Sequence, residues 1–213
     1  VLYTQPGQVY DVDASRSSLI GQAETEMSGS GPRPFDASSN TTTGLFQMDI
    51  NKPFENWTVL GRLDDRVKII PLKDLGLDIQ KSYLVFEFWS KEFKGIYTKQ
   101  FIPNSIDSNF NCQVFCFKEL QNHPQLLATN RHISCGALEL ENLTWAAKTL
   151  KGISKMVEAD LYSIYIYEPS NYQFSTISID NASLIENTKT GAIRKISFKA
   201  KESLTCHWEI KYL

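Results

Sequence analysis

The sequence has few of the residues that build metal or redox sites. It contains four cysteines and three histidines in 213 residues. Cys112 and Cys116 are four positions apart, a longer spacing than the Cys-x-x-Cys pairs of zinc and redox centres, and no second pair follows. Free cysteine packs as a small apolar side chain. We therefore expect Cys112, Cys116, Cys135 and Cys206 to be buried or half-buried thiols, and we expect no metal or other cofactor.

Long hydrophobic runs and concentrated basic charge are also missing. No apolar run approaches the roughly 20 residues with which a helix crosses a bilayer. The chain carries 22 basic and 24 acidic residues, a net charge of -2, and its pI is near 6.0. Binding to nucleic acids or membrane surfaces needs clustered positive charge. The composition therefore argues against nucleic acid and membrane as partners.

A helical period of apolar residues is absent, and alternating runs take its place. The densest run is Tyr83–Trp89, in which both faces are largely apolar. This pattern predicts a central strand that is covered on both sides, with a partner strand at Ile96–Ile102 after the polar loop Ser90–Gly95. Short runs without helices between them predict an antiparallel, Greek-key-like β-sandwich.

Three segments follow from the composition along the chain. Residues 1–43 are rich in Ser, Thr, Gly, Asn and Pro, and we expect them to be an extension that connects to an upstream domain. The first residues lack an initiator Met and a signal-peptide pattern, so we expect a fragment or a processed chain. Residues 44–120 are predicted to form the sandwich, and residues 121–213 a second, smaller, sandwich-like β-domain.

Several short motifs of the chain occur together in one known family. They are Trp57–Val59, Leu75–Leu77, Tyr83–Trp89, Cys112–Val114 and, most specific, His123–Ile133. Their order resembles the C-terminal all-β region of α-galactosidase-like (melibiase-type) glycoside hydrolases. The resemblance covers roughly residues 45–150 and fades toward the C-terminus.

The resemblance implies an accessory role in carbohydrate breakdown. In that family a (β/α)-barrel carries the two catalytic carboxylates, and all-β domains follow it. This chain lacks the strand–helix alternation of a barrel. The implied partner is therefore an upstream barrel of the parent glycoside hydrolase, and no catalytic residue is carried over to this chain. The family favours a secreted or periplasmic location in bacteria, whereas free thiols are also compatible with the cytoplasm, so the sequence leaves the location open.

Carboxylates within the chain offer only weak catalytic candidates. Glycoside hydrolysis needs two carboxyl groups roughly 5–10 Å apart across a sugar-binding cleft. Asp64 and Asp65 are adjacent, so they either face opposite sides of a strand or lie in a turn. We expect them to be turn residues, and we expect this chain alone to be non-catalytic.

The polar pair Arg131 and His132 lies in the most family-specific run. It could face a ligand or another domain. It could equally be a structural junction, in which Arg131 binds backbone carbonyls or acidic side chains. We favour the structural interpretation, and we include Trp89 among the interdomain or structural residues.

An alternative function is a carbohydrate-binding module that holds glycans through exposed aromatic rings. Tyr165 and Tyr167 alternate with Ile164 and Ile166, so they should point away from the core. Trp145, beside a loop, is the next candidate. Large aromatic side chains in sandwiches are more often part of the core. A third possibility is a free-standing structural or adhesion module.

Overall fold

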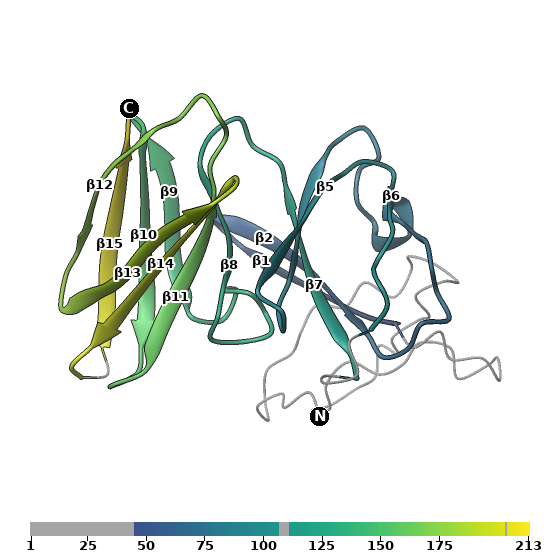
Figure 1. The fold of residues 1–213 in the computed structure, drawn as a ribbon, viewed down its shortest axis with the longest axis horizontal. Coiled ribbons are helices and arrows are strands. Elements are labelled where there is room, and N and C mark those ends of the chain that lie inside the picture. Colours follow the sequence, from purple (N-terminus) through teal and green to yellow (C-terminus); the bar gives the residue numbers. More distant parts are fainter. Residues whose placement is uncertain (1–44, 107–110, 203) are drawn as a thin grey trace. The chain divides into compact units, whose positions relative to one another are not determined.

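The computed structural model describes residues 45–106, 111–202 and 204–213 (Figure 1). The predicted extension at residues 1–43 lies outside the described residues. The described part is built from antiparallel sheets, with one short 3-10 turn, η1 (Leu72–Leu75), as its helical element. The predicted all-β fold class is confirmed. Among the described residues, no helix has the length and apolar character needed to cross a membrane.

The chain divides into two compact units. Unit 1 runs to Asn51 and continues from Asn56 to Leu120. Unit 2 comprises Gln121–Leu213, together with the short turn Lys52–Glu55. Each unit is described below by itself.

Unit 1 contains a five-stranded sheet in the order β1-β2-β7-β4-β5. Strand β7 pairs with β2 on one side and β4 on the other, so neighbours in the sheet are not always neighbours in sequence. The strands are β1 (Leu45–Lys52), β2 (Glu55–Arg62), β4 (Tyr83–Glu87), β5 (Glu92–Tyr97) and β7 (Gln113–Glu119).

A second, two-stranded sheet contributes to the core of unit 1. It consists of β3 (Ile70–Pro71) and β6 (Gln100–Phe101), and η1 follows β3 directly. Phe101 packs edge-on against Phe115 and Phe117, with ring centroids 4.7 and 5.5 Å apart. Leu72 and Leu75 of η1 are buried in the same cluster.

Strand β4 is the most deeply buried strand of unit 1. All five of its side chains are buried, which confirms the predicted strand that is covered on both faces. The strand ends at Glu87, two residues earlier than predicted. The buried Glu87 carboxylate accepts hydrogen bonds from the backbone N–H groups of Trp89, Ser90 and Val114, which holds the chain in a turn. The return strand therefore starts at Glu92, and the predicted strand at Ile96–Ile102 is split between β5 and β6.

Unit 2 is a sandwich of two four-stranded antiparallel sheets. Sheet D has the order β12-β15-β10-β9 and sheet C the order β13-β14-β11-β8. The strands of sheet D are β9 (Leu140–Ala146), β10 (Thr149–Met156), β12 (Phe174–Ile179) and β15 (Leu204–Tyr212). Those of sheet C are β8 (Gln125–Thr129), β11 (Leu161–Tyr167), β13 (Ala182–Thr190) and β14 (Ile193–Ala200).

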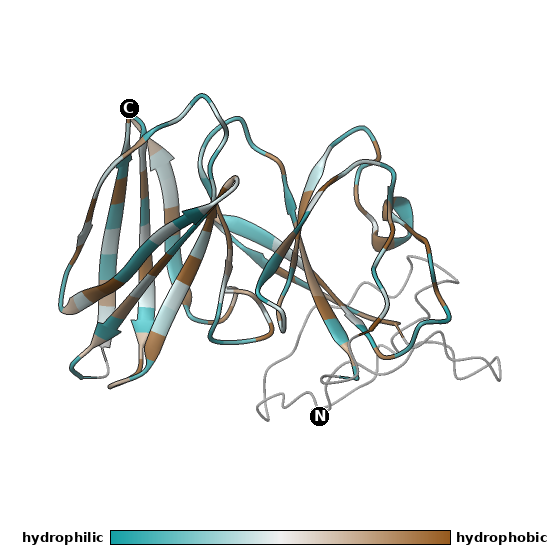
Figure 2. Ribbon diagram, viewed as in Figure 1, coloured by the Kyte–Doolittle hydropathy of each residue, from teal (hydrophilic) through white to brown (hydrophobic). Residues whose placement is uncertain are grey.

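One serine hydroxyl joins the two sheets inside the core. The oxygen of Ser154 on β10 accepts a hydrogen bond from the Tyr162 hydroxyl of β11 at 3.2 Å and from the Trp208 indole N–H of β15 at 3.0 Å. All three side chains are buried. This places Ser154, Trp208 and Tyr162 on the inner faces of the sandwich. Figure 2 shows hydrophobic and hydrophilic residues alternating along many of these strands.

Two segments of unit 2 differ from the sequence-based expectation. The apolar residues of the segment 136–140 predict a strand, but residues 133–139 form turns, in which Cys135 and Gly136 have φ values of 55° and 112°, and strand β9 begins only at Leu140. Strand β13 was not expected because its residues do not alternate. It lies at the edge of sheet C with most of its side chains at least partly exposed, so burial imposes no pattern on it.

The central position of Phe86 in β4 gives a direct test of the fold. Phe86 is fully buried, and its replacement by Ala should lower the free energy of unfolding by about 3–5 kcal/mol through cavity formation. Urea denaturation of the two proteins measures this difference. Ile96→Ala on the neighbouring strand is the control, because Ile96 is 45% exposed and should cost far less. Equal stability of Phe86→Ala and wild type would contradict the placement of this strand.

Candidate functional site

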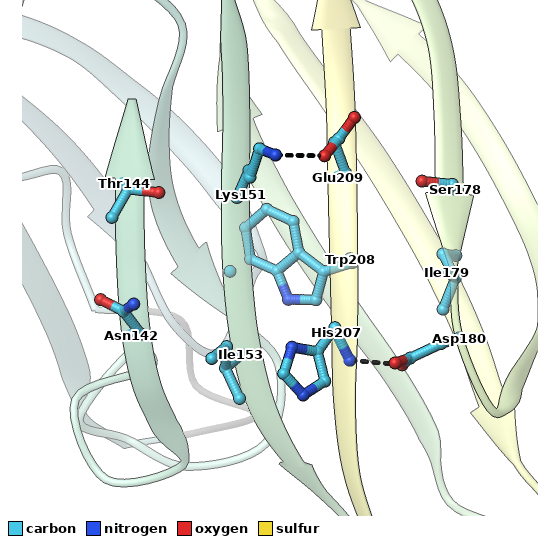
Figure 3. Close-up of a pocket in the computed structure, with 11 residues that line it drawn as sticks. Asn142, Thr144, Lys151, Ile153, Ser178, Ile179, Asp180, His207, Trp208 and Glu209 are labelled. Carbon is cyan, nitrogen blue, oxygen red and sulfur yellow. Dashed lines mark hydrogen bonds and ion pairs between the residues drawn. The ribbon is translucent and has the colours of Figure 1, made fainter. Parts of the chain in front are cut away.

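A hollow of about 460 Å³ lies on sheet D (Figure 3). All four strands of the sheet contribute to it. Because Ser154 and Trp208 face the core, the side chains at alternate positions on β10 and β15 point to the outer face. The residues that line the hollow are Asn142, Thr144, Lys151, Gly152, Ile153, Ser178, Ile179, Asp180, His207, Trp208 and Glu209.

Strand register brings the polar side chains of the hollow into two rows. In the first row Thr144 pairs with Lys151, Lys151 with Glu209, and Glu209 with Ser178. In the second row Asn142 pairs with Ile153, which pairs with His207. Asp180 extends this row, because its N–H donates to the His207 carbonyl at 3.0 Å. Neighbours within a row are separated by the strand spacing of about 4.8 Å.

The Gly152–Trp208 pair forms the centre of the hollow. The Trp208 indole lies so close to Gly152 that a Cβ added there would be 2.0 Å from a ring carbon. Trp208 is nearly fully buried and donates its indole N–H to Ser154. At the bottom of the hollow these two residues therefore expose mainly backbone atoms, while the side chains of their neighbours along each strand line its sides.

The charged groups of the hollow largely balance one another. Glu209 forms ion pairs with Lys151 at 2.6 Å and with Lys211 at 3.2 Å. The hydrogen bond from Lys151, followed by that from Lys211, lowers the pKa of Glu209. Asp180 accepts a hydrogen bond from the backbone N–H of His207 through one carboxylate oxygen.

Other polar groups of the hollow are not engaged by the protein. Within residues 45–106, 111–202 and 204–213, the hydroxyls of Thr144 and Ser178 and the imidazole of His207 make no hydrogen bond. Asn142 uses its side-chain oxygen to accept from the Leu143 N–H at 2.9 Å, which leaves its amide NH₂ group available. The hollow thus presents free donors and acceptors on a rigid sheet.

The cysteines lie apart from any metal-binding arrangement. In the part of the chain that the structure describes, no three His, Cys, Asp or Glu side chains are grouped as a metal site. All four cysteines are free thiols; Cys112 is half-buried and the others are buried, as expected. Cys206 donates to the Asp180 carbonyl at 3.1 Å, and burial, with the nearby Asp180 charge, raises its pKa to about 12. This thiol is therefore protonated and unreactive at neutral pH.

The three aromatic residues predicted to bind carbohydrate do not form one site. Tyr165 and Tyr167 belong to β11 in sheet C, whereas Trp145 belongs to β9 in sheet D. The expectation that Tyr165 is exposed is wrong, because only 6% of it is accessible. Tyr165 points to the outer face of sheet C, as the alternation predicts. That face is covered here, however, because the neighbouring Ser163 and Ser197 are also buried and hydrogen-bond to each other. Tyr167, at the end of the strand, is half-buried.

Trp145 is part of an aromatic cluster and is half-buried. The His123 ring stacks on it, with centroids 4.7 Å apart and planes only 5° from parallel. Tyr172 packs edge-on at 5.5 Å and Tyr212 lies 5.9 Å away. Its ring faces are therefore used largely by the protein itself, which weakens its role as a platform for a sugar.

The predicted structural residues make local contacts. Arg131 donates to the Lys155 carbonyl at 3.3 Å and lies 3.9 Å from the carboxylate of Asp160, within unit 2. The Nδ1 atom of His132 accepts from the Ser134 N–H at 3.1 Å, and burial lowers the pKa of this histidine. Trp89 is half-buried and packs edge-on against Phe88, with centroids 5.1 Å apart.

The adjacent acids Asp64 and Asp65 stabilise the bend in which they lie. Asp64 pairs with Arg66, whose side-chain hydrogen bond lowers the pKa of Asp64. Asp65 forms an ion pair with Arg62 at 2.8 Å and accepts from the Ile106 N–H at 3.1 Å. Both acids are thus turn residues, as expected, and they are not arranged across the hollow.

Glu139 is a buried acid that sequence reasoning did not single out. One of its oxygens accepts a hydrogen bond from the Thr129 hydroxyl, and only 5% of the residue is exposed. Desolvation raises its pKa, although the Thr129 bond and the charges of Arg131 and Lys52 act in the opposite direction. A buried acid in a run without alternation has no sequence signal that would have identified it.

No protein-family model and no curated protein sequence matches this chain. The fold and the geometry of the hollow describe an all-β protein whose second unit carries a polar hollow, with nearly balanced charges, on the outer face of sheet D.

The close contact at Gly152 predicts a large effect of a single methyl group. Gly152→Ala should displace Trp208, weaken its bond to Ser154 and lower the free energy of unfolding by about 1–3 kcal/mol or more. Denaturant melts followed by tryptophan fluorescence measure this loss. Gly61→Ala is the matched control, since a Cβ there would meet its nearest neighbour at an ordinary 3.7 Å. Similar stability of both variants would contradict the packing.

The raised pKa of Glu139 predicts a pH-dependent effect on stability. Folding favours its protonated form, so its contribution is full below the ordinary carboxyl pKa and declines as pH rises through the raised value. Glu139→Gln should therefore become more stable relative to wild type as the pH rises from the ordinary carboxyl pKa toward neutral and mildly alkaline values. Thermal melts across this range measure the difference. Glu209→Gln should show no such trend, because the lowered pKa of Glu209 keeps it ionised throughout.

Proposed function

We propose that this chain is a non-catalytic accessory β-region of an α-galactosidase-like glycoside hydrolase. Its partner is a (β/α)-barrel that lies upstream in the parent protein and performs the hydrolysis. The chain supports that barrel in carbohydrate breakdown.

This proposal rests on the contacts of residues His123–Ile133, which hold part of the unit 2 fold together. His123 stacks on Trp145, and residues 125–129 form the buried strand β8. Asn130 accepts from the Ser163 N–H at 2.8 Å and donates to the Leu161 carbonyl at 2.9 Å. The run that most resembles the family thus has structural contacts, as expected for a region that supports a catalytic domain.

The buried carboxylates support the same interpretation. Glu87 holds three backbone N–H groups in a turn, and Glu139 accepts from Thr129. The side chain of Glu168 is fully buried and pairs with Arg194 at 2.6 Å and Lys189 at 2.9 Å. None of these three acids lines the hollow on sheet D. Their contacts stabilise the two units and offer no proton to a substrate in that hollow.

The alternative function, glycan binding through exposed Tyr and Trp rings, has less support. Tyr165 is buried, and His123 covers a face of Trp145. Tyr167 remains partly accessible, at the end of β11. A single half-buried ring is a weaker platform than the set of three rings that the sequence predicted.

A hydrolase assay tests the proposed function. The purified 213-residue chain should not release the chromophore from aryl α-galactosides, whereas the longer parent protein with its barrel should do so. Turnover by the 213-residue chain, lost on mutation of its own carboxylates, would contradict the accessory role. An upstream reading frame that encodes no barrel would contradict it as well.

A further inference from the structure

We propose that the hollow on the outer face of sheet D binds a neutral saccharide through side-chain hydrogen bonds. This site is separate from the aromatic residues considered above, and it goes beyond an accessory role for the chain. All the residues that form it belong to unit 2.

The available hydrogen-bonding groups fit the hydroxyls of a sugar. Thr144 and Ser178 stand at opposite ends of one row, with the Lys151–Glu209 ion pair between them. In the other row, the amide of Asn142 and the imidazole of His207 flank Ile153. Figure 3 shows these side chains around the Trp208 indole. Hydroxyl, amide and imidazole groups can each donate and accept, which matches the mixed character of sugar hydroxyls.

The charge of the hollow favours an uncharged ligand. Glu209 pairs with both Lys151 and Lys211, and the second carboxylate, Asp180, brings the group to two positive and two negative charges, so there is no net positive charge to attract a phosphate or sulfate. Asp180 has one oxygen committed to the His207 N–H, and its negative charge would further repel an anion. Saccharide rings also have apolar C–H faces, and the outward side chain of Ile153 gives the hollow an apolar portion.

Size and position also favour a saccharide over a peptide. The hollow has a volume of about 460 Å³, within the range of about 300–1,000 Å³ that is typical of small-ligand sites. Extended peptides usually bind at the edge of a sheet, where backbone groups are free. Strands β10 and β15, at the centre of this hollow, each pair with a strand on both sides. Their backbone groups are therefore not available for strand addition.

Titration of the 213-residue chain by ¹H–¹⁵N NMR tests this site. The ligands are neutral mono- and disaccharides of galactose, glucose and mannose, added up to millimolar concentrations. We expect at least one of them to shift the backbone resonances of Thr144, Lys151, Ser178, His207 and Glu209 with a saturable dependence on concentration.

Two variants and one control identify the residues responsible. Thr144→Val and Ser178→Ala should each weaken binding by about threefold to tenfold, the value of one hydrogen bond. Thr176→Val is the matched control, because Thr176 is exposed on the same sheet but pairs with Lys211, outside the hollow. It should bind as wild type does, and melting temperatures should show that all three variants fold.

Several results would overturn the proposal. These are no saturable shift with any sugar, shifts centred on Tyr167 or Trp145, or binding restricted to sulfated or phosphorylated sugars. Equal affinities of Thr144→Val, Ser178→Ala and Thr176→Val would have the same consequence. None of these results would affect the accessory role, which is tested separately by the aryl-galactoside assay.

Discussion

The contact between Trp208 and Gly152 is the constraint on which unit 2 depends. The indole can lie on β10 only because position 152 has no side chain, and from there it reaches Ser154. Ser154 also accepts from Tyr162 of the opposite sheet, so one hydroxyl connects three strands of the core. Buried polar groups are costly without partners, so these bonds favour one register of β10 against β15. That register in turn decides which outward side chains meet across sheet D.

Alternation of apolar and polar residues predicted much of the fold, because burial imposes it on strands that cover a core. The continuous apolar run Tyr83–Trp89 predicted the burial of β4 on both faces, and alternation elsewhere predicted the all-β class. It failed where burial does not act through alternation, as in the exposed edge strand β13. It also failed for Tyr165, since the period of a strand gives the direction of a side chain and does not reveal whether that side is covered.

The hollow could not be predicted from the sequence for a different reason. Its polar residues range from Asn142 to Glu209 and become neighbours only through the pairing of four strands. Individually, Thr144 or Ser178 is an ordinary exposed residue of a strand. By contrast, the run His123–Ile133 is recognisable in sequence because its residues are contiguous, although strand β8 and contacts with the distant Trp145, Leu161 and Ser163 hold it in place. A distinctive motif can therefore mark a structural junction, while a binding surface leaves no motif.

The separation of the two faces of sheet D has a consequence for function. Core-facing residues such as Trp208 fix the geometry, whereas outward residues such as Lys151 and Glu209 contribute little to stability because water screens their charges. A ligand hydroxyl can replace one partner of such an exposed pair without the desolvation cost that a buried pair would impose. Outward residues can therefore change to suit a ligand while the sheet remains intact. A rigid β-sheet whose outer face is nearly neutral in charge can thus acquire saccharide binding without any change to the core.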